Sequence, residues 1–149
     1  GAFFSPDSKR IVYRAAHPTD QAEIDKYKAL LKQGLVEPGQ LEIFVMNADG
    51  SGQRPVTSNG ASNFSPFYFP DGQRIIFSSN IETKGAGGRP SFHLYAIGED
   101  GQGLERLTFD GQFNSFPMFS PDGTRLVWVS DRLAKSPGEF NVFLADWVP

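Results

Sequence analysis

The sequence contains no cysteine and only two histidines, His17 and His93. A disulfide framework and a thiolate zinc site are therefore excluded, and a histidine-rich metal site cannot be assembled from this chain. No apolar stretch approaches the roughly 18 residues of a membrane span, and no basic-then-apolar leader is present. The 14 basic and 17 acidic residues are not gathered into runs of one sign. A nucleic-acid partner, which would need a basic stripe, is not expected.

Catalytic motifs are also missing. The chain has no Gly-x-Ser-x-Gly nucleophile elbow and no phosphate-binding glycine loop after a strand. We therefore predict that this chain is not an enzyme, and that it has no catalytic residue, no metal site and no cofactor.

What the sequence does contain is turns, aromatic residues and internal repeats. It has 16 glycines, 11 prolines and 14 phenylalanines. The run FSPDGTRLVW, at 119–128, is nearly repeated at 4–13 and 68–77. The last two copies lie 51 residues apart, whereas the first lies 64 residues before the second, because one loop carries an insertion.

Each repeat predicts four short strands. A short aromatic stretch leads into Pro-Asp-Gly and an apolar run such as RIIF (74–77), and a polar gap follows. A second apolar run such as LEIFVM (41–46), an Asp-Gly turn and a short run ending in Thr complete the repeat. RIIF is continuously apolar, so both faces of its strand should be covered. Radially stacked four-stranded blades provide this cover, and we predict an all-β fold, a β-propeller.

The order of these motifs resembles the TolB-type (WD-like) β-propeller repeat, and the likeness covers almost the whole chain. Three residues depart from the pattern: Ser8 replaces Gly, Phe69 replaces Ser, and Pro55 interrupts the first Arg-x-Leu-Thr. The resemblance implies a protein-binding scaffold in the periplasm or outside the cell. Similar propellers also cap peptidases, so the fold alone does not assign a function.

Counting strands predicts about three blades in one partial propeller, residues 1–149. Blade 1 spans 2–57 with a helical insertion at 17–40, blade 2 spans 64–108, and blade 3 spans 116–149. Blade 3 should lack its outer strand, because no fourth run follows FNVFLADWV. We expect further blades and the outer strand to come from an N-terminal half absent from this chain or from a second copy.

The insertion carries the signals of a helix within 19–33. Thr19 or Asp20 can cap its N-terminus, Glu23 falls in the first turn, and Gly34 can end it.

Apolar residues of the insertion recur at helical spacing. We predict that the helix packs on the propeller through Ile24 and Leu31. It would then be either a lid over blade edges or a recognition element.

The Pro-Asp-Gly motifs are predicted to be scaffolding. Pro presets φ for a turn, Asp can accept a backbone N–H two residues on, and Gly takes the positive φ. A cation site would need several oxygens at one point, whereas Asp7, Asp71 and Asp122 belong to successive blades spread around a ring. We name the side of the disc that carries the tight turns the turn face.

The long segments fall on the opposite side, which we name the loop-rich face. It is formed by residues 15–40, 58–63, 80–91, 109–114 and 131–139. Irregular segments on a rigid scaffold usually carry binding, so we predict that a partner contacts this face. The predicted contact residues are Arg14, His17, Asn63, Arg89, Asn114 and Arg132.

Two functions stay open. The first is a non-catalytic scaffold that binds a protein or peptide. The second is a propeller domain that gates or supports a hydrolase or peptidase active site outside this chain. An enzyme with its site at the central channel is disfavoured, because the chain supplies neither metal ligands nor a nucleophile.

Overall fold

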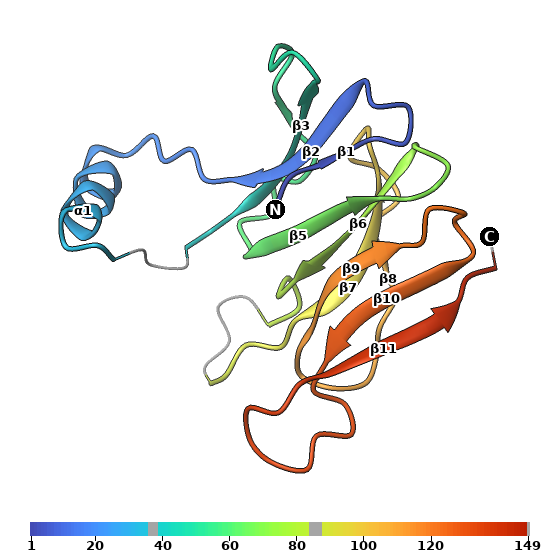
Figure 1. The fold of residues 1–149 in the computed structure, drawn as a ribbon. Helices are drawn as coiled ribbons and strands as arrows, with labels where there is room; N and C mark the ends of the chain where they lie inside the picture. Colours follow the sequence, from blue (N-terminus) through green and yellow to red (C-terminus); the bar gives the residue numbers. More distant parts are fainter. Residues whose placement is uncertain (36–38, 84–87, 149) are drawn as a thin grey trace.

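The computed structural model describes residues 1–35, 39–83 and 88–148. Its strands form three antiparallel sheets that follow one another along the chain (Figure 1). Blade 1 contains β1 (Phe3–Phe4), β2 (Arg10–Ala15), β3 (Glu42–Asn47) and β4 (Arg54–Pro55). Blade 2 contains β5 (Asn63–Tyr68), β6 (Arg74–Ser79), β7 (His93–Gly98) and β8 (Glu105–Arg106). Blade 3 contains β9 (Asn114–Phe119), β10 (Arg125–Ser130) and β11 (Asn141–Asp146). The predicted all-β propeller architecture is confirmed, and blade 3 has three strands in the described part of the chain.

Blade 2 is covered on both faces. On β6, Ile75 and Phe77 pack in the cluster shared with blade 1, and Ile76 packs in the cluster shared with blade 3. All three side chains have 0% exposure. The continuously apolar run therefore fills two cores, as predicted from its lack of alternation.

Blades 1 and 3 are each covered on one face in the part of the chain that is described. On β11, Phe143 and Ala145 pack toward blade 2, whereas Val142 and Leu144 are 72% and 61% exposed. On β1, Phe4 is 60% exposed. The stack of sheets thus ends in an apolar face at each side.

The aspartates of the Pro-Asp-Gly turns bind their own turns. Asp122 Oδ1 accepts hydrogen bonds from the Ser120 hydroxyl at 2.5 Å and from the Thr124 N–H at 3.1 Å. Asp7 and Asp71 likewise accept the backbone N–H two residues on. These hydrogen bonds support the scaffolding interpretation, because they occupy the carboxylates within each turn.

Turns of neighbouring blades also touch. A Cβ atom placed on Gly123, whose φ is +72°, would lie 2.8 Å from the ring of Pro70 in the preceding blade. Glycine is therefore required at this position for two reasons. Its φ is positive, and Pro70 leaves no room for a Cβ atom.

The predicted helix forms as α1 (Gln21–Lys32). Asp20 caps it by accepting the Glu23 N–H at 3.1 Å. At the other end Gly34 takes φ +71°, and the Leu35 N–H reaches the carbonyl of Leu30 at 3.0 Å. These contacts form the glycine-ended cap that the sequence predicted.

The predicted packing of α1 is wrong. No residue of the helix is buried, Leu31 is 47% exposed, and Ile24 is only half-buried. Figure 1 shows α1 standing away from the sheets, and no described strand packs against it. Residues 36–38 of the predicted insertion lie outside the described residues.

Candidate binding surface

The long segments leave the sheets at one end, as Figure 1 shows for the insertion with α1 and for the segments before β7 and β11. The tight turns leave at the other end. The loop-rich face is therefore built from the starts of the first and third strands of each blade.

Asn63 fixes the segment that connects blade 1 to blade 2. Its side chain has 0% exposure. Its amide donates to the Leu41 carbonyl at 2.8 Å and to the Glu42 carboxylate at 3.0 Å, and its oxygen accepts the Ser79 hydroxyl at 2.6 Å. Glu42 also accepts the Gly60 N–H at 2.7 Å. With its donors and acceptor used internally, Asn63 positions the loop and is not accessible to a partner.

Asn114 occupies the matching place between blades 2 and 3. It too has 0% exposure and donates to the Asp110 carbonyl at 2.9 Å. Its oxygen accepts from Arg132 Nη2 at 3.2 Å. The Arg132 guanidinium lies 5.2 Å from the ring of Trp128, so Arg132 is held in place while remaining partly exposed.

The other predicted contact residues lie on the surface. Arg14 is exposed at the end of β2, and Arg89 is exposed in the segment before β7. His17 is exposed and its ring lies 4.8 Å from that of Phe44. The structure therefore leaves four of the six predicted residues accessible: Arg14, His17, Arg89 and Arg132.

His93 differs from its counterpart in the preceding repeat. It stands at the position of Glu42 but leaves Nδ1 buried without a partner among the described atoms. Burial, and then the charge of Arg106, lowers the pKa of His93 below its ordinary value. The imidazole is therefore neutral at pH 7.

Sequence reasoning missed a group of aromatic residues at this end of blades 2 and 3. We name it the phenylalanine cluster; its members are Phe64, Phe92, Phe113, Phe116 and Phe140. Their ring centroids lie 5.0 to 6.4 Å apart along a connected set of contacts. The repeat alignment hides the cluster, because Phe64 corresponds to Ser115 and Phe113 to Ser62. An available signal was that Phe92, Phe113 and Phe140 each stand immediately before a strand.

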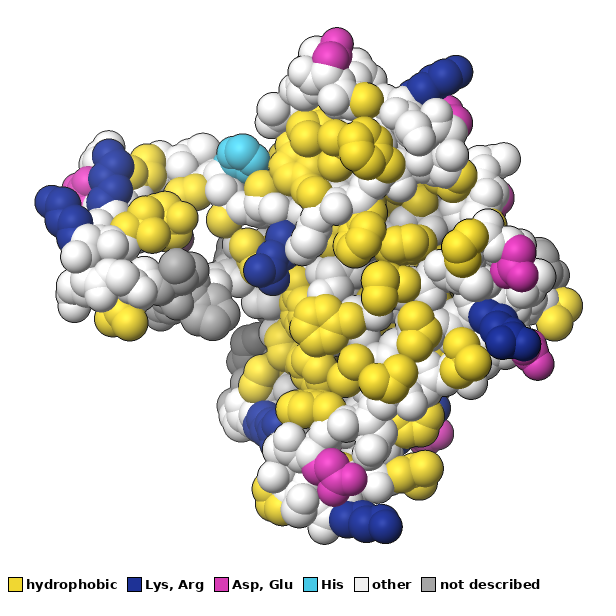
Figure 2. Space-filling model, in the orientation of Figure 1, with side chains coloured by type: hydrophobic (Ala, Val, Ile, Leu, Met, Phe, Trp, Pro, Cys, Tyr) yellow, Lys and Arg dark blue, Asp and Glu magenta, His cyan; other side chains and the backbone are white. Residues whose placement is uncertain are grey.

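Two members of the cluster are open to solvent. Phe116 is 52% exposed and Phe140 is 46% exposed. Phe116 also has φ +56°, a conformation that costs a bulky residue about 1 kcal/mol or more. Leu133, in the segment before β11, is 80% exposed. Figure 2 shows hydrophobic side chains gathered in the middle of this view, where β5 and β9 lie.

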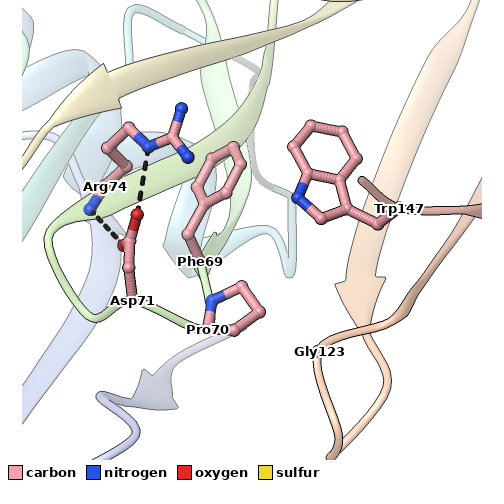
Figure 3. A pocket seen from close by; sticks show the side chains of 6 residues that line it. All are labelled: Phe69, Pro70, Asp71, Arg74, Gly123 and Trp147. Atoms are coloured by element: carbon pink, nitrogen blue, oxygen red, sulfur yellow. Dashed lines mark hydrogen bonds and ion pairs between the residues drawn. The ribbon is translucent and has the colours of Figure 1, made fainter. Parts of the chain in front are cut away.

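The turn face carries a small pocket. Figure 3 shows it between the Pro-Asp-Gly turn of blade 2 and the end of blade 3, with the ring of Phe69 between Arg74 and Trp147. Its volume is about 80 Å³. The Arg74 guanidinium lies 4.4 Å from the Phe69 centroid and binds Asp71 at 3.2 Å. The charged groups of this pocket are thus paired with each other.

A wider groove of about 350 Å³ runs between the outer parts of blades 2 and 3. Leu107, Phe109, Trp128 and Arg132 are among the residues that line it. Trp128 Nε1 is buried and has no hydrogen-bond partner in the described chain. The groove adjoins the loop-rich face through Arg132.

The ranges that the structure describes are residues 1–35, 39–83 and 88–148. These ranges contain no cluster of three or more acidic or histidine side chains able to hold a metal ion. Their helix is too short to cross a membrane.

Comparison with known proteins identifies relatives of this fold. The model of the family described as TolB beta propeller domain matches residues 28–146. TolB from Acinetobacter baumannii aligns with a TM-score of 0.67 at 25% identity, over 97% of this chain and 29% of that protein. A putative TolB from Agrobacterium tumefaciens aligns with a TM-score of 0.68 at 24% identity, over 98% of this chain and 46% of that one.

A curated relative is a peptidase. The chain is 28% identical over 140 residues to dipeptidyl-peptidase 5 of Porphyromonas endodontalis. The match covers 93% of this chain but 17% of the peptidase. The chain therefore spans less than half the length of each of these three relatives.

Proposed function

Because the chain belongs to the family of TolB β-propeller domains, we propose that it is a non-catalytic scaffold that binds a protein or peptide on its loop-rich face. The observation that carries the proposal is the phenylalanine cluster with its exposed members Phe116 and Phe140. Exposed aromatic side chains supply large contact areas at low entropic cost, and they are enriched where proteins bind one another.

The accessible polar residues complete this surface. Arg132 lies beside the cluster and is fixed by Asn114, so its guanidinium is oriented before a partner arrives. Arg14, His17 and Arg89 lie on the same face and would form a polar rim. The buried side-chain amides of Asn63 and Asn114 would act indirectly. They fix the segments that connect successive blades, and these segments adjoin the phenylalanine cluster.

The test is selection of peptides from a displayed library on the chain, followed by affinity measurement with single variants. Phe140→Ser should weaken binding of the selected peptides at least tenfold, because it removes an exposed ring from the contact area. Leu104→Ser is the matched control, since Leu104 is 45% exposed at the turn face. Equal affinities for both variants, at unchanged melting temperature, would place binding elsewhere.

The similarity to dipeptidyl-peptidase 5 favours a second candidate function. In this second function the propeller gates or supports a hydrolase active site located outside this chain. The loop-rich face then contacts a catalytic domain or its substrate. The complete reading frame separates the two candidates. A hydrolase segment together with peptidase activity of the whole protein supports the gate, and further propeller repeats alone support the scaffold.

The proposal extends to location and assembly. We place the protein in the periplasm or outside the cell by analogy with TolB. The exposed apolar faces of blades 1 and 3 would receive further blades, from a longer chain or from a second copy.

A further inference from the structure

His93 begins β7 and directly follows the residue that holds the segment between blades 2 and 3. We name residues 109–114 the connecting segment. The Phe92 N–H donates to the Gln112 carbonyl at 2.7 Å, and the Asn114 N–H donates to the Phe92 carbonyl at 2.8 Å. Since both hydrogen bonds end on the residue next to His93, a movement of His93 reaches the connecting segment directly.

The equivalent segment between blades 1 and 2 is held by a carboxylate. Glu42 stands in that repeat at the position of His93. Its carboxylate accepts the Thr57 hydroxyl at 2.5 Å, the Gly60 N–H at 2.7 Å and the Asn63 side-chain amide at 3.0 Å. Three donors around that segment thus share one acceptor group.

His93 does not replace these contacts. It is 6% exposed, and its Nδ1 is buried without a partner among the described atoms. The Asn114 side-chain amide donates instead to the Asp110 carbonyl at 2.9 Å. A carboxylate reaches the connecting segment from blade 3, where Asp131 Oδ1 accepts the Gln112 N–H at 2.8 Å. The segment is therefore held around His93 and not by it.

Three charged groups act on the His93 imidazole, and each is engaged elsewhere. Arg106 of β8 forms an ion pair with Glu82, which follows β6. Asp131, which follows β10, accepts two backbone N–H groups. Burial, and then the charge of Arg106, lowers the pKa of His93, and the two carboxylates oppose this lowering only in part. Among the described residues, a protonated imidazole would find both carboxylates already in use.

We propose that His93 is an acid-sensitive switch that releases the connecting segment. A charged imidazole is far better solvated by water than by its buried site. On protonation the hydrogen bonds between Phe92 and the segment would open, and water would reach the ring. Phe113 of the phenylalanine cluster lies in this segment, so the loop-rich face would change shape in acid. The inference does not rest on the function proposed for that face.

The direction of the response follows from the two forms of the segment. In the open form the histidine has its ordinary pKa of 6.5, whereas burial lowers the pKa of His93 in the closed form. The open form therefore binds the proton first as the pH falls below about 6.5. The opening equilibrium should rise by up to tenfold for each pH unit, until the closed form is protonated as well.

Hydrogen exchange of the 149-residue chain, followed by NMR between pH 7 and pH 5, measures this opening. The Asn114 N–H reports on the connecting segment. The Asn63 N–H, which donates to the Leu41 carbonyl at 3.0 Å, is the matched control in the segment without a histidine.

The protection factor of Asn114 should fall relative to that of Asn63, by up to tenfold for each pH unit below about 6.5. A constant ratio of the two protection factors would overturn the proposal, whether both amides keep their protection or lose it together.

The substitution His93→Gln tests the residue itself. Glutamine keeps a polar side chain at this position but does not titrate, so the ratio of the two protection factors should become independent of pH. A ratio that still falls in the variant would assign the response to another group, such as Asp131, and would overturn the proposal.

A titration of the parent chain decides the matter even if His93→Gln does not fold. NMR of the imidazole carbons follows the two histidines of the chain, and His17→Gln, a change at an exposed residue, identifies the signal of His93. Its midpoint should lie below 6.5. A midpoint at or above this value would show that the closed segment does not resist the proton, and the switch would be wrong.

Discussion

Gly123 lies where two constraints meet at a single residue. Its φ of +72° disfavours any side chain, and an added Cβ would lie 2.8 Å from Pro70. Gly50 has φ +85° with nothing within 4 Å of such a Cβ. Gly50→Ala should therefore cost about 1 kcal/mol of unfolding free energy from backbone strain, and Gly123→Ala about 2–3 kcal/mol because blades 2 and 3 must also separate. Urea unfolding measures both; equal losses would mean that the turns do not touch.

Asp122 makes the stability of the turn sensitive to acid. Hydrogen bonds from Ser120, and then from Thr124, lower the pKa of Asp122 from 3.8 to about 2. The unfolded chain therefore takes up this proton first as the pH falls, so the contribution is complete above about pH 4 and is lost between pH 4 and pH 2.

The substitution Asp122→Asn tests this assignment. The variant should melt at a lower temperature at pH 7, because the turn loses a charged acceptor, and its melting temperature should fall less between pH 4 and pH 2 than that of the parent. Peptide binding at the loop-rich face should be unchanged. A pH profile parallel to that of the parent would show that Asp122 does not titrate with folding.

The roles of single residues could be predicted where the chemistry is local. Asp122 and Gly34 act within a few residues of their own positions, and the sequence shows both the residue and its turn. Asn63 and Asn114 were expected to be contact residues, but their burial depends on strands that come from two blades. The phenylalanine cluster was missed for the same reason, since its rings meet only when blades 2 and 3 stack.

At the scale of elements, α1 shows that forming a helix and packing it are separate problems. The cap at Asp20 and the glycine end are local, so the helix could be predicted. Its packing depends on the path of the segments that join it to β2 and β3, which no pattern of apolar residues reports.

Removal of the cap gives a test of this independence. Asp20→Ala should destabilise α1 by about 1 kcal/mol and increase hydrogen exchange of its first-turn amides. The melting temperature of the sheets should not change, because no described strand packs on the helix. A drop in that melting temperature would show that α1 docks on the propeller in solution.

At the scale of the whole molecule, the chain behaves as a stack in which each blade contacts only its neighbours. The sequence predicted this stack, because both its 51-residue repeat and its continuously apolar second strands are visible without a structure. The sequence could not show which side-chain contacts join neighbouring blades. Stability in such a stack is the sum of each blade and its interfaces, so one interface can be weakened without the next.

Glu99 of blade 2 joins blades 1 and 2 through ion pairs. It is 7% exposed as a residue, and its carboxylate binds Arg10 at 2.5 Å and Arg54 at 2.6 Å and accepts the Tyr68 hydroxyl at 3.2 Å. Both arginine side chains are more than a third exposed, so water can solvate them again once the carboxylate is removed. Glu99→Gln should therefore cost about 2–3 kcal/mol, less than the cost of breaking a fully buried ion pair.

The loss should be confined to one end of the stack. Hydrogen exchange of β2 and β3 should accelerate in Glu99→Gln, while β10 keeps its protection, because the cluster between blades 2 and 3 contains none of the residues that bind Glu99. Glu105→Gln, on the exposed side of β8, is the matched control and should change neither. If β10 lost protection together with β2, the three blades would unfold as one cooperative unit, and the description by neighbouring interfaces would be wrong for this chain.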